Sequence, residues 1–213
     1  MSKFNFTQRY IESASISDTD GIILDVVGSD VPKRVDYSDF LDLVGGDIAN
    51  GFVFVDELSD LPTPISNVIT LEDNTTYYIT NTLDLVGNRL VGGQNTVILG
   101  SSSENSRITS TGLGVGVPLF TTDWTTPIRH VTFQDVDTVL DIDGTTNPPV
   151  ALDWTGVNFL NVPNIGLIDT ADNFIFSKGA ILNSQNLQFD GSHGTIGIDN
   201  SIFVGTGLSL IHI

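Results

Sequence analysis

Three stretches of this chain align with one another: VTFQDVDTVLDID from Val131, VNFLNVPNIGLID from Val157, and LQFDGSHGTIGID from Leu187. In each stretch the third residue is phenylalanine, the twelfth is isoleucine and the last is aspartate. The phenylalanines are Phe133, Phe159 and Phe189, the isoleucines are Ile142, Ile168 and Ile198, and the aspartates are Asp143, Asp169 and Asp199. The starts of the stretches lie 26 and 30 residues apart. A repeat of this length is typical of a solenoid, because one unit cannot bury its apolar face alone and has to stack on its neighbours.

The apolar spacing inside these stretches favours strands over helices. Val131 and Phe133 alternate with polar residues at period two, as do the matching residues of the other stretches, whereas a helix would need spacings of three and four. Residues 150–153 (VALD) supply a further strand, which we expect to fall in phase with residues 180–183 (AILN) in the next coil. The sequence therefore predicts an all-β fold, a parallel β-helix with the three phenylalanines stacked in one interior row.

Composition narrows the possible partners. Of 213 residues, 8 are Lys or Arg and 26 are Asp or Glu, which gives a formal net charge of -18. Such a chain repels phosphate backbones and anionic lipid, so the sequence predicts no nucleic-acid and no membrane partner. The chain has no cysteine, which excludes disulfides and thiolate metal sites. No window approaches the roughly 18 apolar residues of a membrane span, and the opening MSKFNFTQRYIES lacks the apolar run of a signal peptide.

The first part of the chain, residues 1–50, is expected to form a small head. Residues 22–27 and 33–37 read as two strands of a β-hairpin around a Gly-Ser-Asp turn. Ser38 can then cap a short helix over residues 39–43, which the following Gly-Gly ends.

The remainder divides into a β-helix over residues 51–207 and a short tail. The tail, LSLIHI at 208–213, is what CTGTCTCTTATACACATC encodes, and that string is a transposon end used as a sequencing adaptor. We therefore expect these six residues to be the non-native end of a metagenomic reading frame. His212 is accordingly given no chemical role.

The head carries a pattern of the form D-x-hydrophobic-hydrophobic-x-V-V-x-G followed by K-(K/R)-V-x-x-S-D-hydrophobic-L. Lys33 and Arg34 supply its basic pair, and Pro32 replaces the Gly or Thr that usually precedes it. Over about 30 residues this segment resembles the N-terminal module of tail fibres and other structural proteins of tailed bacteriophages.

Residues 67–100 read as short strands separated by turns, with TYYI and TLDL before a G-N-x-L-V-G-G-x-N-T turn. This arrangement is similar to the opening coils of phage β-helix proteins, and with the phenylalanine stretches the resemblance covers most of residues 51–207. It implies a right-handed parallel β-helix of the pectate-lyase-like kind. Tailspikes, fibres and sugar-cleaving enzymes share that fold, which alone does not choose among them.

Metal and cofactor motifs are weak throughout. The stretch DVDTVLDIDG offers four carboxylates, Asp135, Asp137, Asp141 and Asp143. Their order does not match an EF-hand loop, and the calcium-binding nonapeptide repeat does not occur. The repeat alignment favours a simpler account, in which Asp143, Asp169 and Asp199 occupy one turn of successive coils and bond the local backbone. No metal site and no cofactor is predicted.

An acid/base pair for sugar cleavage is also not supported. Glycosidases need two carboxyl groups roughly 5 to 9.5 Å apart, and coils stacked about 4.8 Å apart would bring pairs such as Asp143 and Asp169 into range. Every Asp-rich β-helix meets that test. Glu72 and Glu104 are the only glutamates of residues 67–207. The basic residues that a lyase could use belong to no motif; they are Arg89, Arg107, Arg129 and Lys178.

Histidine and tryptophan offer little further chemistry. His130 and His193 have no serine or cysteine partner in a nucleophile context, so surface or turn positions are expected. Trp124 and Trp154 could stack on sugar rings. Trp154 shares a face with Leu152, which favours core or inter-subunit packing.

Taken with the resemblance, these observations predict a non-catalytic structural component of a bacteriophage virion, in the tail fibre or baseplate region. A tailspike-type polysaccharide depolymerase, hydrolase or lyase, and a passive glycan-binding β-helix stay as alternatives. The resemblance implies a homotrimer for the full-length protein, contacts with other virion proteins through the head, a host surface glycan as a further partner, and a location in the virion after synthesis in the bacterial cytoplasm.

Overall fold

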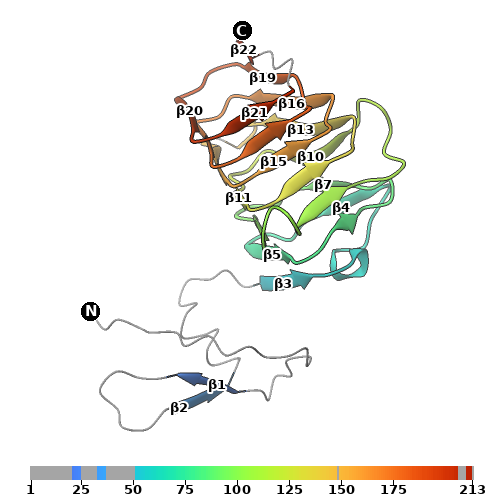
Figure 1. Ribbon diagram of the computed structural model, residues 1–213, viewed down its shortest axis with the longest axis vertical. Helices are drawn as coiled ribbons and strands as arrows, with labels where there is room; N and C mark the ends of the chain where they lie inside the picture. The colour runs from blue at the N-terminus through green and yellow to red at the C-terminus, as the bar shows by residue number, and fades with distance from the viewer. Residues whose placement is uncertain (1–20, 25–32, 37–50, 148, 206–209, 213) are drawn as a thin grey trace, which may run out of the picture. The chain divides into compact units, whose positions relative to one another are not determined.

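The computed structural model describes residues 21–24, 33–36, 51–147, 149–205 and 210–212 (Figure 1). The chain divides into two compact units, Met1–Ala49 and Asn50–Ile213. In the first unit, β1 (Gly21–Leu24) and β2 (Lys33–Asp36) pair antiparallel, which confirms the two strands of the predicted hairpin. The predicted turn and the short helix over residues 39–43 lie outside the described residues.

The second unit is a parallel β-solenoid of about seven turns, built from three sheets (Figure 1). Sheet I contains β4 (Val68–Thr70), β7 (Arg89–Val91), β10 (Pro118–Thr122), β13 (Thr138–Asp143), β16 (Asn164–Asp169), β19 (Leu187–Asp190) and β22 (Leu210–His212). Sheet II contains β3 (Gly51–Val55), β5 (Thr75–Ile79), β8 (Val97–Gly100), β11 (Ile128–Arg129), β14 (Ala151–Thr155), β17 (Asn173–Ser177) and β20 (Thr195–Asp199). Sheet III contains β6 (Leu83–Asp84), β9 (Arg107–Thr109), β12 (Thr132–Gln134), β15 (Asn158–Leu160), β18 (Ala180–Leu182) and β21 (Ile202–Val204).

From β4 onward the chain visits sheets I, II and III in turn, and each strand pairs in parallel with the strand one coil earlier. Period-two alternation sends every second side chain of these strands into the interior. The predicted all-β parallel β-helix is therefore confirmed. Residues 210–212 form β22 beside β19, and the adaptor origin of the tail stays a prediction.

The interior is filled by rows of apolar side chains that run along the stack. In sheet III, Phe133 pairs with Phe159, and Phe159 pairs with Ile181 in the next coil. The rings of Phe133 and Phe159 are stacked, with centroids 5.9 Å apart, and both are fully buried. Because apolar residues of successive coils are in register, each ring has apolar neighbours in the coils before and after it. The repeat buries its apolar face in this way.

The expectation that Phe189 joins this row is wrong. Phe189 lies in β19 of sheet I, where it pairs with Ile168, and the residue that follows Phe159 in sheet III is Ile181. The same error affects Asp199, which lies in sheet II beside Ser177, so that Asp190 follows Asp169 in its row.

The cause is a change in coil length. The loop between β13 and β14 covers residues 144–150, whereas the loop between β16 and β17 covers only residues 170–172. Equivalent corner residues are consequently 26 positions apart across the first of these coils and 22 apart across the next. A third stretch starting 30 residues after the second therefore begins in the next sheet.

The expected phase match between residues 150–153 and 180–183 fails for the same reason. Residues 151–155 form β14, which pairs with β17, whereas residues 180–182 form β18, which pairs with β15.

Corners of the coil depend on left-handed backbone conformations. After sheet III the corner residues with positive φ are Asp135, Asn161, Asn183 and Gly205; after sheet II they are His130, Gly156, Lys178 and Asn200. Asparagine and glycine are favoured here because a Cβ is costly at positive φ and short polar side chains offset part of that cost. The Asn- and Gly-rich composition thus supplies the bends that close each coil.

The first coil carries a short 3-10 helix, η1 (Leu58–Asp60), between β3 and β4. Asp60 Oδ2 accepts hydrogen bonds from the backbone N–H groups of Asp56 and Glu57 at 2.9 and 3.0 Å. Leu61 is buried and Leu58 packs against the core. The segment therefore adds apolar contacts to the core at the first coil.

Candidate functional site

Three aromatic rings cluster on the outer face of sheet II at the first two coils. Phe52 and Phe54 belong to β3 and Tyr78 to β5, and Phe54 pairs with Tyr78 in register. The ring centroids of Phe52 and Phe54 are 5.0 Å apart, those of Phe54 and Tyr78 are 5.6 Å apart, and Phe52 stacks on Tyr78 at 6.0 Å. Phe52 is 38% exposed and Phe54 50% exposed. We call these three residues the aromatic cluster.

Strand alternation places these rings outside the core. In Gly51–Val55, Val55 is buried and Val53 packs against the core, so the two phenylalanines of the same strand project outward. In Thr75–Ile79, Tyr77 is buried and Tyr78 lies on the outer face. The cluster was not predicted from the sequence. The available signal was the strict F-V-F-V alternation, which requires one residue type to face out.

Polar groups border the cluster where β3 and β5 end. The Thr80 hydroxyl donates a hydrogen bond to Asp56 Oδ1, and Asn81 Nδ2 donates to the same oxygen at 3.4 Å. Flat aromatic faces beside a carboxylate, an amide and a hydroxyl can hold the apolar face of a sugar ring and bond its hydroxyls. The arrangement suits binding rather than bond cleavage.

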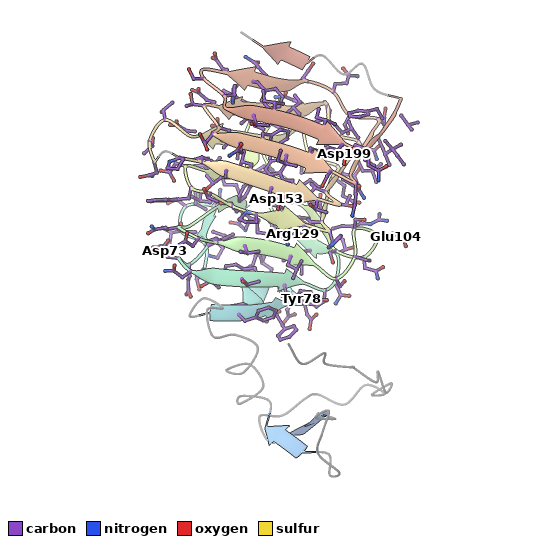
Figure 2. All side chains as sticks on the ribbon, turned by 90° about the vertical axis from the view of Figure 1, so that its left-hand side faces the viewer. Asp73, Tyr78, Glu104, Arg129, Asp153 and Asp199 are labelled. Atoms are coloured by element: carbon purple, nitrogen blue, oxygen red, sulfur yellow. The ribbon has the colours of Figure 1, made fainter. Side chains whose placement is uncertain are left out.

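Along this face, the row that contains Tyr78 becomes polar after Leu99. Tyr78, Leu99, Arg129, Thr155, Ser177 and Asp199 follow one another in register along sheet II. Arg129 and Asp153 form an ion pair of 2.8 Å with both side chains about half exposed, and Figure 2 shows them above Tyr78 on the stack. An exposed pair of this kind contributes little stability.

The predicted aspartate turn is partly correct. Asp143 and Asp169 are paired in register, and Asp190, not Asp199, continues the row. Asp143 Oδ1 accepts the backbone N–H of Thr145 at 2.9 Å, and Asp143 Oδ2 accepts the hydroxyl of Thr146 at 3.1 Å. Hydrogen bonds from Thr145 hold the pKa of the Asp143 carboxyl below its ordinary value.

The other carboxylates of DVDTVLDIDG do not converge. Asp135 sits at a corner and accepts a hydrogen bond from Asn161, Asp137 accepts the backbone N–H of Gly116 at 2.8 Å, and Asp141 is exposed on sheet I. Within the described ranges, no group of three or more His, Cys, Asp or Glu side chains has the arrangement of a metal site.

The described surface includes two shallow depressions. One, of about 190 Å³ on the outer face of sheet I, is lined by Thr138, Asn164, Gln188 and a single carboxylate, Asp141, among others. The other, of about 210 Å³ at the first coil, brings Asp60 and Glu72 to the wall beside Tyr77. Asp60 is occupied there as a helix cap. Burial raises the pKa of the Tyr77 hydroxyl, to which the Glu72 N–H donates at 2.9 Å.

The histidines and tryptophans occupy structural positions. His130 is an exposed corner residue, as expected, whereas His193 is half-buried, accepts the N–H of Ala171 at 3.1 Å and packs edge-on against Phe189. Trp154 is fully buried and its Nε1 donates to the Thr126 carbonyl at 3.2 Å, which confirms the prediction of core packing. Trp124 is half-buried.

The basic side chains lie in different strands and corners of the stack. Arg107 donates to the Glu104 carbonyl at 2.8 Å and to Gln134 Oε1 at 3.1 Å, and Lys178 is an exposed corner residue. Arg89 is half-buried in β7 of sheet I. The structure therefore gives these residues positions in different strands rather than one shared site.

Comparison with known proteins adds no family: no family model, no curated protein and no solved structure matches the chain. In the part of the chain that the structure describes, no helix has the length and hydropathy needed to cross a membrane.

Proposed function

We propose that this chain is a non-catalytic structural component of a bacteriophage virion, in the tail fibre or baseplate region. The observation that carries the proposal is the uninterrupted stack, in which sheets I and II each run through seven parallel strands. Backbone hydrogen bonds and interior rows connect each coil to the next, so the stack is a stiff rod suited to a load-bearing or spacing role. The resemblance of the head to tail-fibre modules supports the virion assignment.

The same resemblance supports the proposed partners. The chain acts as a homotrimer in the full-length protein, joins other virion proteins through the head, and is incorporated into the virion after synthesis in the host cytoplasm. The net charge of -18 supports a role away from nucleic acid and anionic membranes.

Passive glycan binding is a second candidate, and the aromatic cluster favours it. Exposed phenylalanine and tyrosine rings on a flat sheet are platforms for the apolar face of a sugar. The acidic surface favours a neutral glycan over an anionic one, because an anionic chain would be repelled.

A polysaccharide depolymerase receives less support. A general acid at neutral pH needs a raised carboxyl pKa, whereas Asp143 has a lowered one. At Asp84, burial raises the pKa, but hydrogen bonds from Thr111 and from the N–H of Val86 outweigh it and leave the pKa below its ordinary value. The depression at the first coil brings two carboxylates, Asp60 and Glu72, to its lining.

Incubation with a panel of bacterial surface polysaccharides separates these functions. The structural proposal predicts no new reducing or unsaturated ends. Cleavage that disappears in Glu72→Gln and persists in Glu104→Gln would overturn it in favour of an enzyme. Binding without cleavage that is lost in Tyr78→Ala and Phe54→Ala would establish the glycan-binding function.

A further inference from the structure

The outer face of sheet III changes from polar to apolar along the stack. Register orders its outward positions as Arg107, Thr132, Asn158, Ala180 and Ile202 in one row, and Gln134, Leu160, Leu182 and Val204 in the other. In the early coils these side chains hydrogen-bond to one another: Arg107 donates to Gln134 Oε1 at 3.1 Å, and Asn158 donates to Thr132 Oγ1 at 3.2 Å. From β18 onward both rows are aliphatic.

We call the later part of this face the aliphatic stripe; it comprises Leu160, Ala180, Leu182, Ile202 and Val204. Leu160 and Leu182 have a coil on either side and are still only half-buried, so their exposure is lateral. Ile202 and Val204 continue the two rows in β21, the last strand of sheet III, where no further strand of the described chain covers them and they are 60% and 56% exposed. The stripe runs along the axis of the stack, so it can meet the side of another solenoid along its length.

Charge distinguishes this stripe from the neighbouring faces. At the same coils, sheet I carries outward carboxylates at Asp141, Asp143, Asp169 and Asp190, and sheet II carries them at Asp153 and Asp199. The stripe carries none. Two like charges 4 Å apart repel by about 1 kcal/mol in water and about 4 kcal/mol at a protein surface. Two copies of a chain with a net charge of -18 therefore meet most easily at the uncharged stripe.

The border of the stripe is polar. Along one edge, Asn183 Nδ2 donates to Asn161 Oδ1 at 3.0 Å, and Asn161 Nδ2 donates to Asp135 Oδ1 at 2.9 Å. Each amide keeps further donor and acceptor capacity, with which this edge can hydrogen-bond to a neighbouring copy. An apolar centre with a polar, hydrogen-bonding rim is the usual composition of a protein interface.

We propose that the aliphatic stripe of sheet III is the surface through which two copies of this chain pack side by side. The inference rests on the self-association included in the proposed function, and it holds whether or not the assembly belongs to a virion. The occupant is a second copy because an uncharged aliphatic surface matches itself, whereas the rest of these coils is acidic.

The stripe is small. Successive coils are about 4.8 Å apart, so three coils cover less surface than the roughly 800 Å² per partner of a standard interface. We therefore expect weak association that a covalent trap reveals better than a sizing column.

The absence of cysteine from the sequence makes such a trap clean. Leu182→Cys introduces the only thiol at the centre of the stripe. Ile175→Cys is the matched control, because Ile175 is a half-buried outward residue of β17 in the preceding sheet of the same coil, beside Asp153. A bismaleimide with an arm of about 10 Å, roughly two coil spacings, is added to the full chain, and products are resolved under denaturing conditions.

We expect at least a tenfold higher yield of cross-linked species for Leu182→Cys than for Ile175→Cys, with matching circular dichroism and thermal unfolding for the two variants. Equal yields, or a higher yield for Ile175→Cys, would overturn the stripe as the contact surface. Light scattering of the unsubstituted chain separates the two levels of the proposal. If the unsubstituted chain associates while Leu182→Cys fails to cross-link, the choice of the aliphatic stripe as the contact surface is wrong. If the unsubstituted chain stays monomeric up to millimolar concentration, the proposal that the chain self-associates is wrong.

Discussion

Asn161 donates a hydrogen bond of 2.9 Å from its Nδ2 to Oδ1 of Asp135, the corner residue one coil earlier. Both residues have positive φ, and Asn183 extends the ladder into the following coil. The ladder couples two requirements of a solenoid, because the same residue supplies the bend of the corner and a side-chain bond between coils. Two substitutions at Asn161 can separate these contributions.

Asn161→Ala removes both ladder bonds of Asn161, the one to Asp135 and the one from Asn183, and places a residue without a compensating polar group at positive φ. A left-handed conformation costs an ordinary residue about 1–2 kcal/mol, and two exposed hydrogen bonds together contribute about 1 kcal/mol. We expect Asn161→Ala to lower the free energy of unfolding by about 2–3 kcal/mol and Asn161→Gly by only about 1 kcal/mol, measured by urea denaturation. An Asn161→Gly variant that is the less stable of the two would contradict this division.

Phe159→Ala tests the interior row. Phe159 is fully buried and stacks on Phe133 and Phe176, with ring centroids 5.9 and 6.1 Å away. Removal of a buried phenylalanine ring costs about 3–5 kcal/mol. Phe54→Ala, which removes a ring that is 50% exposed, should cost less than about 1 kcal/mol. Chemical denaturation of the two variants should show this ranking, and equal losses would argue against the described interior.

Acid should weaken the corner at Asp84. The folded-state pKa of Asp84 is lowered, so its hydrogen bonds from the N–H groups of Val86 (2.9 Å) and Thr111 (2.8 Å) contribute stability above the unfolded-state pKa of about 3.8. That contribution is lost as the pH falls through the lower folded-state pKa. Asp84→Asn should therefore be less stable than the unsubstituted chain at pH 7, and the difference between their melting temperatures should shrink below pH 4. A difference that is constant from pH 7 to pH 3 would refute this role.

Calcium should not stabilise the protein. The Asp143 oxygens accept hydrogen bonds from Thr145 and Thr146 of the local turn, and Asp137 Oδ2 accepts one from Gly116 of the preceding coil, so these carboxylates already have partners within the protein. Thermal unfolding in millimolar calcium should match that in millimolar EDTA within about 1 °C. A rise of several degrees with calcium, abolished by Asp143→Asn and retained by Asp153→Asn, would show that the turn interpretation is incomplete.

The sequence was sufficient to predict the fold class because period-two alternation and corner chemistry are local. The V-x-F spacing identified strands, and the first two stretches aligned correctly, so Phe133 and Phe159 are in register. The third stretch failed because loop length is not periodic: once the loop before sheet II shortened, Phe189 fell in sheet I. An alignment based only on identical residues cannot detect this change in loop length, because inward positions of all three sheets accept phenylalanine.

The candidate site was less accessible from sequence. Phe52 and Phe54 are the larger apolar residues of F-V-F-V, and burial energy alone would place them inside. The register with β5 puts Val53 and Val55 inside instead, opposite Tyr77 and Ile79. The neighbouring coil decides whether the phenylalanines or the valines of this strand face inward. Strand alternation could therefore indicate that one of the two residue types was exposed, but not which one.

Long-read sequencing across the gene tests the central claim, a structural role in a phage virion, most directly. We predict that single reads carrying the gene also carry genes for tail, baseplate or other virion proteins on both sides. Flanking genes for polysaccharide metabolism or cell-surface secretion, with no virion genes on the same reads, would contradict it.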